Sequence, residues 1–243
     1  MDTTKEFTHV SLCAGYGGID IGLKRSIDNL RTVAFCEIEA YACANLVAKM
    51  EEGKLDTAPI WTNLKTFPWE SFRGKVDILS GGFPCQPFSA AGKRAGDKDE
   101  RHLFPFILQG IAECQPRIVF LENVEGILSA KLSGDGWRDP AGTPVLLHVL
   151  RELERVGYEC TAGMFSAEEV GAPHRRNRIF IMAHSNGSGS WKDFLLSQLR
   201  AYRFEQPSGD SWLLGSEGEG LEVTRWPARP GQPQFDWEPP RTI

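Results

Sequence analysis

Short apolar runs alternate with longer segments of helical spacing along most of the chain. The apolar runs predict strands at residues 8–13, 32–37, 59–63, 76–79 and 117–124. Apolar positions spaced along one face predict helices at about residues 19–29, 40–52, 102–114 and 144–156, and residues 125–143 have the character of a loop. This alternation of strands and helices predicts an α/β fold built on a mostly parallel sheet.

Two details refine this sheet. Residues 118–121 are continuously apolar, which is typical of a strand covered on both faces. Residues 159–166 and 178–183 read as two further strands that bracket an arginine-rich turn, and they predict an antiparallel hairpin at the end of the sheet. In the first helix, Ile19, Gly22, Leu23 and Ile27 are predicted to share one face.

The strand that starts at Val76 is followed by the richest chemistry of the chain. Gly81 and Gly82 are predicted to stop this strand, and Cys85 follows between two prolines, Pro84 and Pro87. Because proline fixes φ, this loop presents the thiol in a restricted position, beyond the carboxyl end of a strand where α/β proteins place ligands. A partly ionised thiol there is a candidate nucleophile, although a single cysteine is more often simply buried.

A second candidate site lies at the start of the chain. Residues 14–18, AGYGG, form a glycine-rich turn between the first strand and the first helix, where the backbone can approach a ligand. Glu37 ends the second strand about 20 residues later, a position suited to holding ribose hydroxyls. Each feature also has a plain structural explanation, because tight turns use glycine and Glu37 or Glu39 could cap a helix.

Composition limits the classes of function. The chain has 243 residues and a net charge of −5, so any nucleic-acid binding would depend on local basic clusters. No apolar run approaches the roughly 20 residues that span a bilayer, and the first residues do not resemble a signal peptide. Six cysteines without a CxxC pair predict no metal site and indicate reduced thiols in a cytoplasmic protein.

Four motifs, in order and covering about residues 8–184, resemble those of the DNA (cytosine-5)-methyltransferases of prokaryotic or phage type, including enzymes of restriction-modification systems. They are Ser11-Leu12-Cys13-Ala14-Gly15-Tyr16-Gly17-Gly18, Pro84-Cys85-Gln86 with Ser89, Leu121-Glu122-Asn123-Val124, and Gly171-Ala172-Pro173-His174-Arg175-Arg176-Asn177-Arg178. The resemblance implies a Rossmann-like fold that uses S-adenosyl-L-methionine, with double-stranded DNA as partner and no membrane.

The resemblance also assigns roles to residues. The implied catalytic residues are Cys85, Glu122, Asn123, Arg176 and Arg178. The implied cofactor-binding residues are Cys13, Ala14, Gly15, Tyr16, Gly17, Gly18, Glu37, Ile38, Ile60, Gly82, Pro84 and Leu103. In this family the cysteine adds to C6 of a cytosine flipped out of the duplex, the glutamate contacts N3, and an arginine lies beside O2. The polar loop 92–101, with Lys93, Arg94 and Lys98, would close over the DNA.

The chain departs from the family in two places. At Pro59 the family commonly has an acid that contacts adenine, and Asn63 could only approximate that contact. Residues 186–243 form a tail rich in proline and tryptophan, whereas the family continues with a target-recognition region and a final helix that completes the cofactor site. We therefore expect a catalytic domain at 1–185, a partial or degenerate remainder at 186–243, and weak cofactor binding by the isolated chain.

Three hypotheses follow. The first is a DNA cytosine-5 methyltransferase. The second is a similar enzyme that methylates cytosine in tRNA, which would be recognised through splayed loops and 2′-hydroxyls. The third is a truncated, inactive or split-enzyme fragment that needs a second chain to supply the absent C-terminal motifs.

Overall fold

The computed structural model describes residues 6–84, 103–132 and 142–186. Cys85, the loop 92–101 and the tail 187–243 lie outside these residues. The described chain forms two compact units, one made of residues 6–165 and 178–186, and another that includes Ser166–Asn177. The first unit carries the sheet and most of the predicted site, and the second carries most of the arginine-rich motif.

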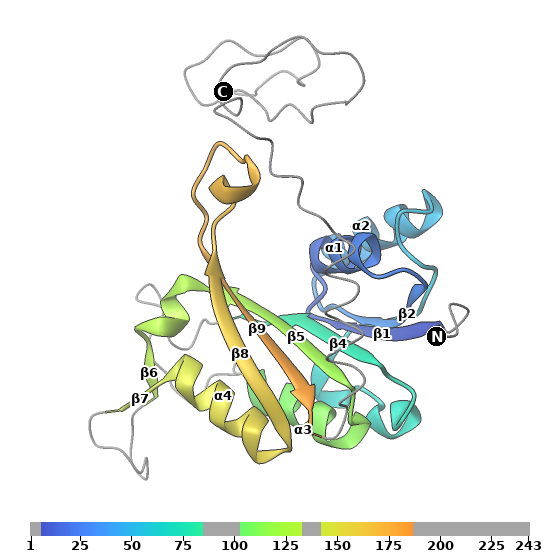
Figure 1. Ribbon diagram of the computed structural model, residues 1–243. Helices are drawn as coiled ribbons and strands as arrows, with labels where there is room; N and C mark the ends of the chain where they lie inside the picture. Colours follow the sequence, from blue (N-terminus) through green and yellow to red (C-terminus); the bar gives the residue numbers. More distant parts are fainter. Residues whose placement is uncertain (1–5, 85–102, 133–141, 187–243) are drawn as a thin grey trace. The chain divides into compact units, whose positions relative to one another are not determined.

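One seven-stranded sheet forms the centre of the first unit, in the order β3-β2-β1-β4-β5-β9-β8 (Figure 1). Its strands are β1 (Phe7–Leu12), β2 (Leu30–Cys36), β3 (Ile60–Trp61), β4 (Ile78–Gly82), β5 (Ile118–Val124), β8 (Tyr158–Phe165) and β9 (Arg178–Ser185). The strands β1 to β5 are parallel, and β9 runs antiparallel to both β5 and β8. The predicted mostly parallel sheet and its antiparallel hairpin are thus confirmed.

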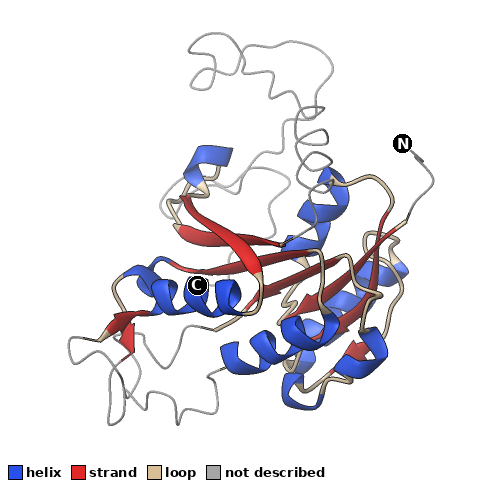
Figure 2. Ribbon diagram, turned by 60° about the horizontal axis from the view of Figure 1, so that its bottom comes forward, coloured by secondary structure: helices blue, strands red, loops and turns tan. Residues whose placement is uncertain are grey.

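Four helices cover the two faces of the sheet (Figures 1 and 2). They are α1 (Gly18–Ser26), α2 (Ala40–Glu51), α3 (Phe104–Cys114) and α4 (Val145–Arg155). Phe7 and Ile78 pack with Ile27 on the α1 side, whereas their strand neighbours Val10 and Leu79 join the larger core with α3 and α4. This division follows from the period of two in a strand, which sends successive side chains to opposite faces. None of the helices in the described part of the chain is long and apolar enough to cross a membrane.

The remaining elements are short. They are the 3-10 helices η1 (Leu64–Thr66), η2 (Trp69–Phe72), η5 (Glu125–Leu128) and η6 (Glu168–Val170), and the paired strands β6 (Lys131–Leu132) and β7 (Thr143–Pro144). The prediction of a plain loop over residues 125–143 was therefore wrong at both of its ends. Residues 133–141 lie outside the described residues.

Two local predictions were wrong. Gly81 and Gly82 do not stop β4, because both pair in register with Leu121 and Glu122 of β5. A Cβ at Gly81 would lie 3.2 Å from the backbone oxygen of Leu12, so this glycine permits a close approach of two strands. In α1, the predicted face is also shifted, since Gly22 is exposed and Asp20 is buried instead.

Candidate active site

The carboxyl ends of four neighbouring strands bring most of the predicted residues to one edge of the sheet. Leu12 of β1 pairs with both Cys36 of β2 and Gly81 of β4, and Gly82 pairs with Glu122 of β5. The glycine turn, the end of β2, the end of β4 and the end of β5 therefore follow one another along this edge. This is where ligands bind in open α/β sheets.

The glycine turn is held in a shape that few side chains allow. Cys13 has a φ of +48° and Gly17 a φ of +72°. A Cβ at Gly17 would lie 2.9 Å from Leu55 Cδ1 and 3.2 Å from Leu46 Cδ2, so the turn packs tightly on this side. At Gly15, by contrast, a Cβ would meet no atom within 4 Å. The turn therefore packs against other side chains at Gly17 and leaves open space at Gly15.

Cys13 itself is a poor nucleophile. Burial raises the pKa of its thiol to about 12, and the nearby Glu37 carboxylate raises it further in the same direction. The thiolate, which is the reactive form, is therefore scarce at neutral pH. Cys13 contributes an apolar wall at the start of the turn, where it packs against the main core.

Glu37 connects the glycine turn to the end of β2. Its Oε2 accepts the Gly15 N–H at 2.7 Å, and its Oε1 accepts the N–H groups of Ile38 and Glu39 at 2.8 and 2.9 Å. These bonds tie the glycine turn to the residues just before α2, but neither Glu37 nor Glu39 caps the helix, because α2 begins at Ala40 and has no side-chain capping bond at its start. A carboxylate offers about four acceptor positions, so these three bonds leave capacity for one ligand hydroxyl.

Glu122 and Arg178 form an ion pair at the end of β5. Arg178 Nε lies 2.6 Å from Glu122 Oε1, and each side chain keeps about a quarter of its surface exposed (24% for Glu122, 23% for Arg178). Gly82 lies opposite Glu122, and a Cβ there would be 3.2 Å from Glu122 Oε2. The absence of a side chain at Gly82 therefore leaves room for the carboxylate beside the strand that leads to Cys85.

Asn123 points to the other face and is almost completely buried. Its Nδ2 donates to the Phe83 carbonyl at 3.1 Å, and its Oδ1 accepts the Val124 N–H at 2.8 Å. The side chain thereby ties the end of β5 to the segment immediately before Pro84. It fixes the start of the loop that carries Cys85.

Asn123→Ala is expected to lower the free energy of unfolding by about 3 kcal/mol, because it leaves a buried carbonyl and a partly buried N–H without partners. Urea denaturation measures the change. The matched control is Asn63→Ala, which removes an exposed side-chain bond to the Lys65 N–H and should cost about 1 kcal/mol. Equal losses in the two variants would contradict the positioning role of Asn123.

The other predicted residues are placed less decisively. Ile38 is 73% exposed at the edge, Ile60 packs beside Phe35 and Leu46, and Leu103 packs against the main core before α3. Arg176 has a φ of +36° and belongs to the second unit, so its place in the site stays a prediction. Cys85 lies outside the described residues, and its role also stays a prediction.

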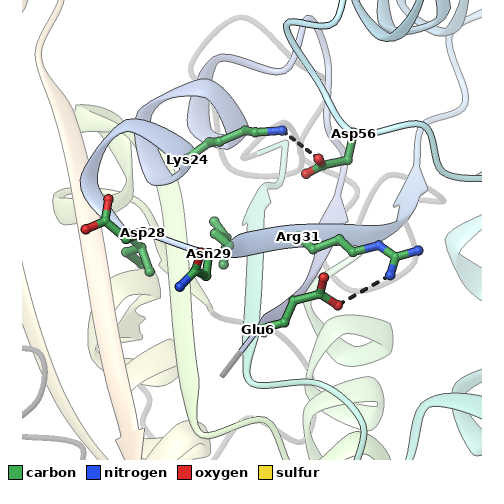
Figure 3. Close-up of a pocket in the computed structure, with 8 residues that line it drawn as sticks. Glu6, Lys24, Asp28, Asn29, Arg31 and Asp56 are labelled. Atoms are coloured by element: carbon green, nitrogen blue, oxygen red, sulfur yellow. Dashed lines mark hydrogen bonds and ion pairs between the residues drawn. The ribbon is translucent and has the colours of Figure 1, made fainter. Parts of the chain in front are cut away.

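A cavity of about 440 Å³ lies away from this edge (Figure 3). Its lining includes Glu6 just before β1 and Leu30 at the start of β2, so it is at the amino ends of the strands. Two ion pairs occupy its walls, Lys24 with Asp56 and Arg31 with Glu6. Because four of its charged side chains are already paired with one another and it lies at the amino ends of the strands, this cavity is not the candidate active site.

Sequence reasoning missed one set of polar residues near the site. His9, Asp20, Thr32 and Ser80 are all buried between α1 and the sheet. The only signal in the sequence was the presence of polar residues within otherwise apolar strands. No group of three or more His, Cys, Asp or Glu side chains in the described ranges is arranged to hold a metal ion.

Comparison with known proteins gives a consistent result. The family model for C-5 cytosine-specific DNA methylases matches residues 7–217. Similar curated proteins include the type II methyltransferase M.NgoMIV of Neisseria gonorrhoeae, 34% identical over 181 residues, which cover 74% of this chain and 53% of that protein. The type II methyltransferase M.Eco47II of Escherichia coli is 35% identical over 190 residues, which cover 77% of this chain and 42% of that protein. This chain spans about half the length of these curated relatives.

Solved structures are similar in fold. The Dnmt2 methyltransferase of S. pombe aligns with a TM-score of 0.57 at 22% identity, over 74% of this chain and 51% of that one. A DNA modification methyltransferase encoded within an E. coli prophage aligns with a TM-score of 0.54 at 19% identity, over 77% of this chain and 48% of that one. These likenesses confirm the predicted Rossmann-like fold.

Proposed function

Because this chain belongs to the family of C-5 cytosine-specific DNA methylases, we propose that it transfers a methyl group from S-adenosylmethionine to C5 of cytosine in DNA. The observation that carries the proposal is the Glu122–Arg178 pair, held beside the strand that leads to Cys85. A paired acid and cation at this edge suit a pyrimidine ring, whose N3 and O2 are adjacent polar atoms.

The described residues fit the methyl donor. The glycine turn is open at Gly15, the Glu37 carboxylate retains an acceptor position, and the apolar Ile38 side chain is exposed beside it. The backbone at Gly15 would bind a polar group of the donor, and the Glu37 carboxylate would accept a hydrogen bond from a ribose hydroxyl. The Ile38 side chain would pack on the face of a flat ring. The donor, when bound, supplies a methyl group on a positively charged sulfur.

In the proposed reaction, the Cys85 thiolate forms a bond to C6 of cytosine. The electron pair of the C5–C6 double bond moves to the C4–C5 bond, the pair of the C4–N3 double bond moves onto N3, and N3 takes a proton from Glu122. Arg178 stabilises the charge that develops at O2, because a cation is worth most where charge appears in the transition state. C5 is then enamine-like and would form a bond to the methyl carbon of the donor, whose bond to sulfur would break with the electron pair remaining on sulfur.

The second half of the reaction returns Cys85 and Glu122 to their starting states. A base removes the proton from C5, the bond between C6 and the Cys85 sulfur breaks, and the N3 proton returns to Glu122. Asn123 would hold the start of the Cys85 loop in place throughout, through its bond to the Phe83 carbonyl. The cytosine must leave the base stack for the thiol to reach C6, at a cost of a few kcal/mol.

Glu37→Gln is expected to weaken S-adenosylmethionine binding by about tenfold, because the amide NH2 replaces one acceptor oxygen and places N–H groups either against the Gly15 donor or against the Ile38 and Glu39 donors. Isothermal calorimetry on the full chain measures the dissociation constant. Glu39→Gln is the matched control, since Glu39 is exposed and adjacent. If both variants bind equally, Glu37 does not contact the cofactor.

The proposal as a whole is tested by transfer of a radiolabelled methyl group to a panel of DNA duplexes and to transcribed tRNA. We expect label in duplex DNA, located on cytosine C5 after digestion. Label in tRNA alone would replace the proposal with the RNA alternative. The assay is repeated with candidate partner chains, because a split enzyme would transfer methyl groups only in that arm.

A further inference from the structure

A buried polar cluster lies between α1 and the sheet, immediately below the glycine turn. His9 comes from β1, Thr32 from β2, Ser80 from β4 and Asp20 from the first turn of α1. Each of these residues is less than 5% exposed. The proposed reaction uses none of them, although all four lie next to elements that carry the site.

His9 is fully engaged by two hydroxyl groups. Its Nδ1 lies 2.9 Å from Thr32 Oγ1, and its Nε2 lies 2.8 Å from Ser80 Oγ. Burial lowers the pKa of His9 to about 3, against an opposing effect of Asp56. The imidazole is therefore neutral at physiological pH and gives no cation to its neighbours.

Asp20 lies close to His9 but is not hydrogen-bonded to it. Its Oδ1 is 3.7 Å from His9 Nδ1, which exceeds hydrogen-bonding distance. Within the described residues, neither oxygen of this carboxyl has a hydrogen-bond partner. Burial raises the pKa of Asp20 to about 6, and the nearby Ser11 hydroxyl and the backbone N–H of Asp20 itself have smaller effects in the opposite direction. The group is therefore mostly ionised near neutral pH, and a buried, unpaired charge is unfavourable.

The charged side chains near Asp20 form ion pairs with other residues. Lys24, one turn later in α1, lies 2.5 Å from Asp56, whose other oxygen accepts the Thr32 N–H at 3.0 Å (Figure 3). On the β4 and β5 side, Arg178 is paired with Glu122. Among the described residues, no lysine or arginine forms an ion pair with Asp20. Within the part of the chain that the structure describes, the cluster thus holds one anion without a lysine or arginine as counter-charge.

We propose that Asp20 is a specificity-determining residue, a buried counter-charge that favours the cationic methyl donor over its uncharged thioether product. The proposal rests on the proposed function. Asp20 follows the Gly15–Gly18 turn within one helical turn, so its charge acts on the site through protein rather than through bulk water. S-adenosylmethionine carries one more positive charge than S-adenosylhomocysteine, and the two ligands are otherwise nearly identical in shape.

The experiment compares the two ligands by calorimetry on the full chain. At pH 8, Asp20→Asn is expected to weaken S-adenosylmethionine binding by about tenfold and S-adenosylhomocysteine binding by less than about twofold. Asp28→Asn, at an exposed position after α1, is the matched control and should change neither. Equal weakening of both ligands, or no change in either, would overturn the proposal.

The wild-type chain gives a second measure that does not depend on the folding of a variant. Lowering the pH from 7 to 5 protonates Asp20, so the preference for S-adenosylmethionine over S-adenosylhomocysteine should decrease. The range stops at pH 7 because the positively charged sulfur lowers the pKa of the amino group of S-adenosylmethionine, and near pH 8 the two ligands would also differ in the charge of that group. A preference that stays constant with pH would overturn the proposal. If the wild-type chain binds neither ligand, the proposed function itself fails.

The pH dependence of the stability of the unliganded protein distinguishes a buried, unpaired Asp20 from an Asp20 that caps α1. The pKa of Asp20 is raised above its ordinary value near 4, so the folded state holds the proton more tightly than the unfolded state. Stability should therefore fall as pH rises from about 4 to 6, and Asp20→Asn should remove this fall and be the more stable protein above pH 6. A helix-capping role predicts the opposite, a less stable variant at that pH.

Discussion

Cys85→Ser is expected to lower the rate of methyl transfer by about a thousandfold or more, while the affinity for S-adenosylmethionine changes by less than about twofold. A serine hydroxyl is far less acidic than a thiol, so the nucleophile that adds to C6 is lost with only a small decrease in side-chain size. The rate is measured with radiolabelled donor and duplex DNA, and the affinity by calorimetry.

The control for this variant is Cys160→Ser, at a partly buried cysteine of β8. It should retain full activity. A loss of both activity and cofactor binding in Cys85→Ser would indicate misfolding, and retained transfer would remove Cys85 from the mechanism. A duplex with 5-fluorocytosine gives an independent readout, because fluorine at C5 cannot leave as a proton, and only the wild-type chain should form a stable covalent adduct.

The order of strands and helices could be predicted because buried parallel strands have a simple pattern. Ile118, Val119 and Leu121 form an apolar run in the sequence and are buried in β5. The edge that holds the site could also be predicted, since parallel strands end together. Glu37 directly follows β2 and Glu122 lies near the end of β5, so both are at the same edge although they are far apart in the sequence.

What could not be predicted depends on contacts between distant segments. Glycine usually interrupts a strand, but Gly81 continues β4 because Leu12 of the next strand approaches too closely for a side chain. The burial of Asp20 likewise depends on the packing of α1 against the sheet, whereas helical spacing in the sequence pointed to Gly22 instead. The bond from Asn123 to the Phe83 carbonyl joins residues 40 apart, and nothing in either local sequence indicates it.

At this edge of the sheet, the residues suited to the methyl donor and those suited to the base come from different pairs of strands. β1 and β2 carry the glycine turn and Glu37, which suit the methyl donor, and β4 and β5 carry Gly82, Glu122 and Asn123, which suit the base. Gly82 lies between them, because its position faces Glu122 Oε2 at 3.2 Å and the Cys13 backbone oxygen at 3.9 Å. A side chain at this point would crowd the Glu122 carboxylate, whereas its distance from Cys13 would be an ordinary van der Waals contact.

Glu122→Gln is expected to reduce kcat by about a hundredfold to a thousandfold, with little change in S-adenosylmethionine affinity. The amide keeps the size of the side chain and can hydrogen-bond N3, but it cannot deliver a proton to that atom. Loss of the ion pair with Arg178 accounts for only about 1 kcal/mol, because both side chains are partly exposed.

The matched control is Glu159→Gln. It weakens the 3.4 Å contact between Glu159 of β8 and His184 of β9 and should leave kcat unchanged. Single-turnover kinetics separate the chemical step from product release, and an unchanged single-turnover rate in Glu122→Gln would show that N3 is not protonated by this residue.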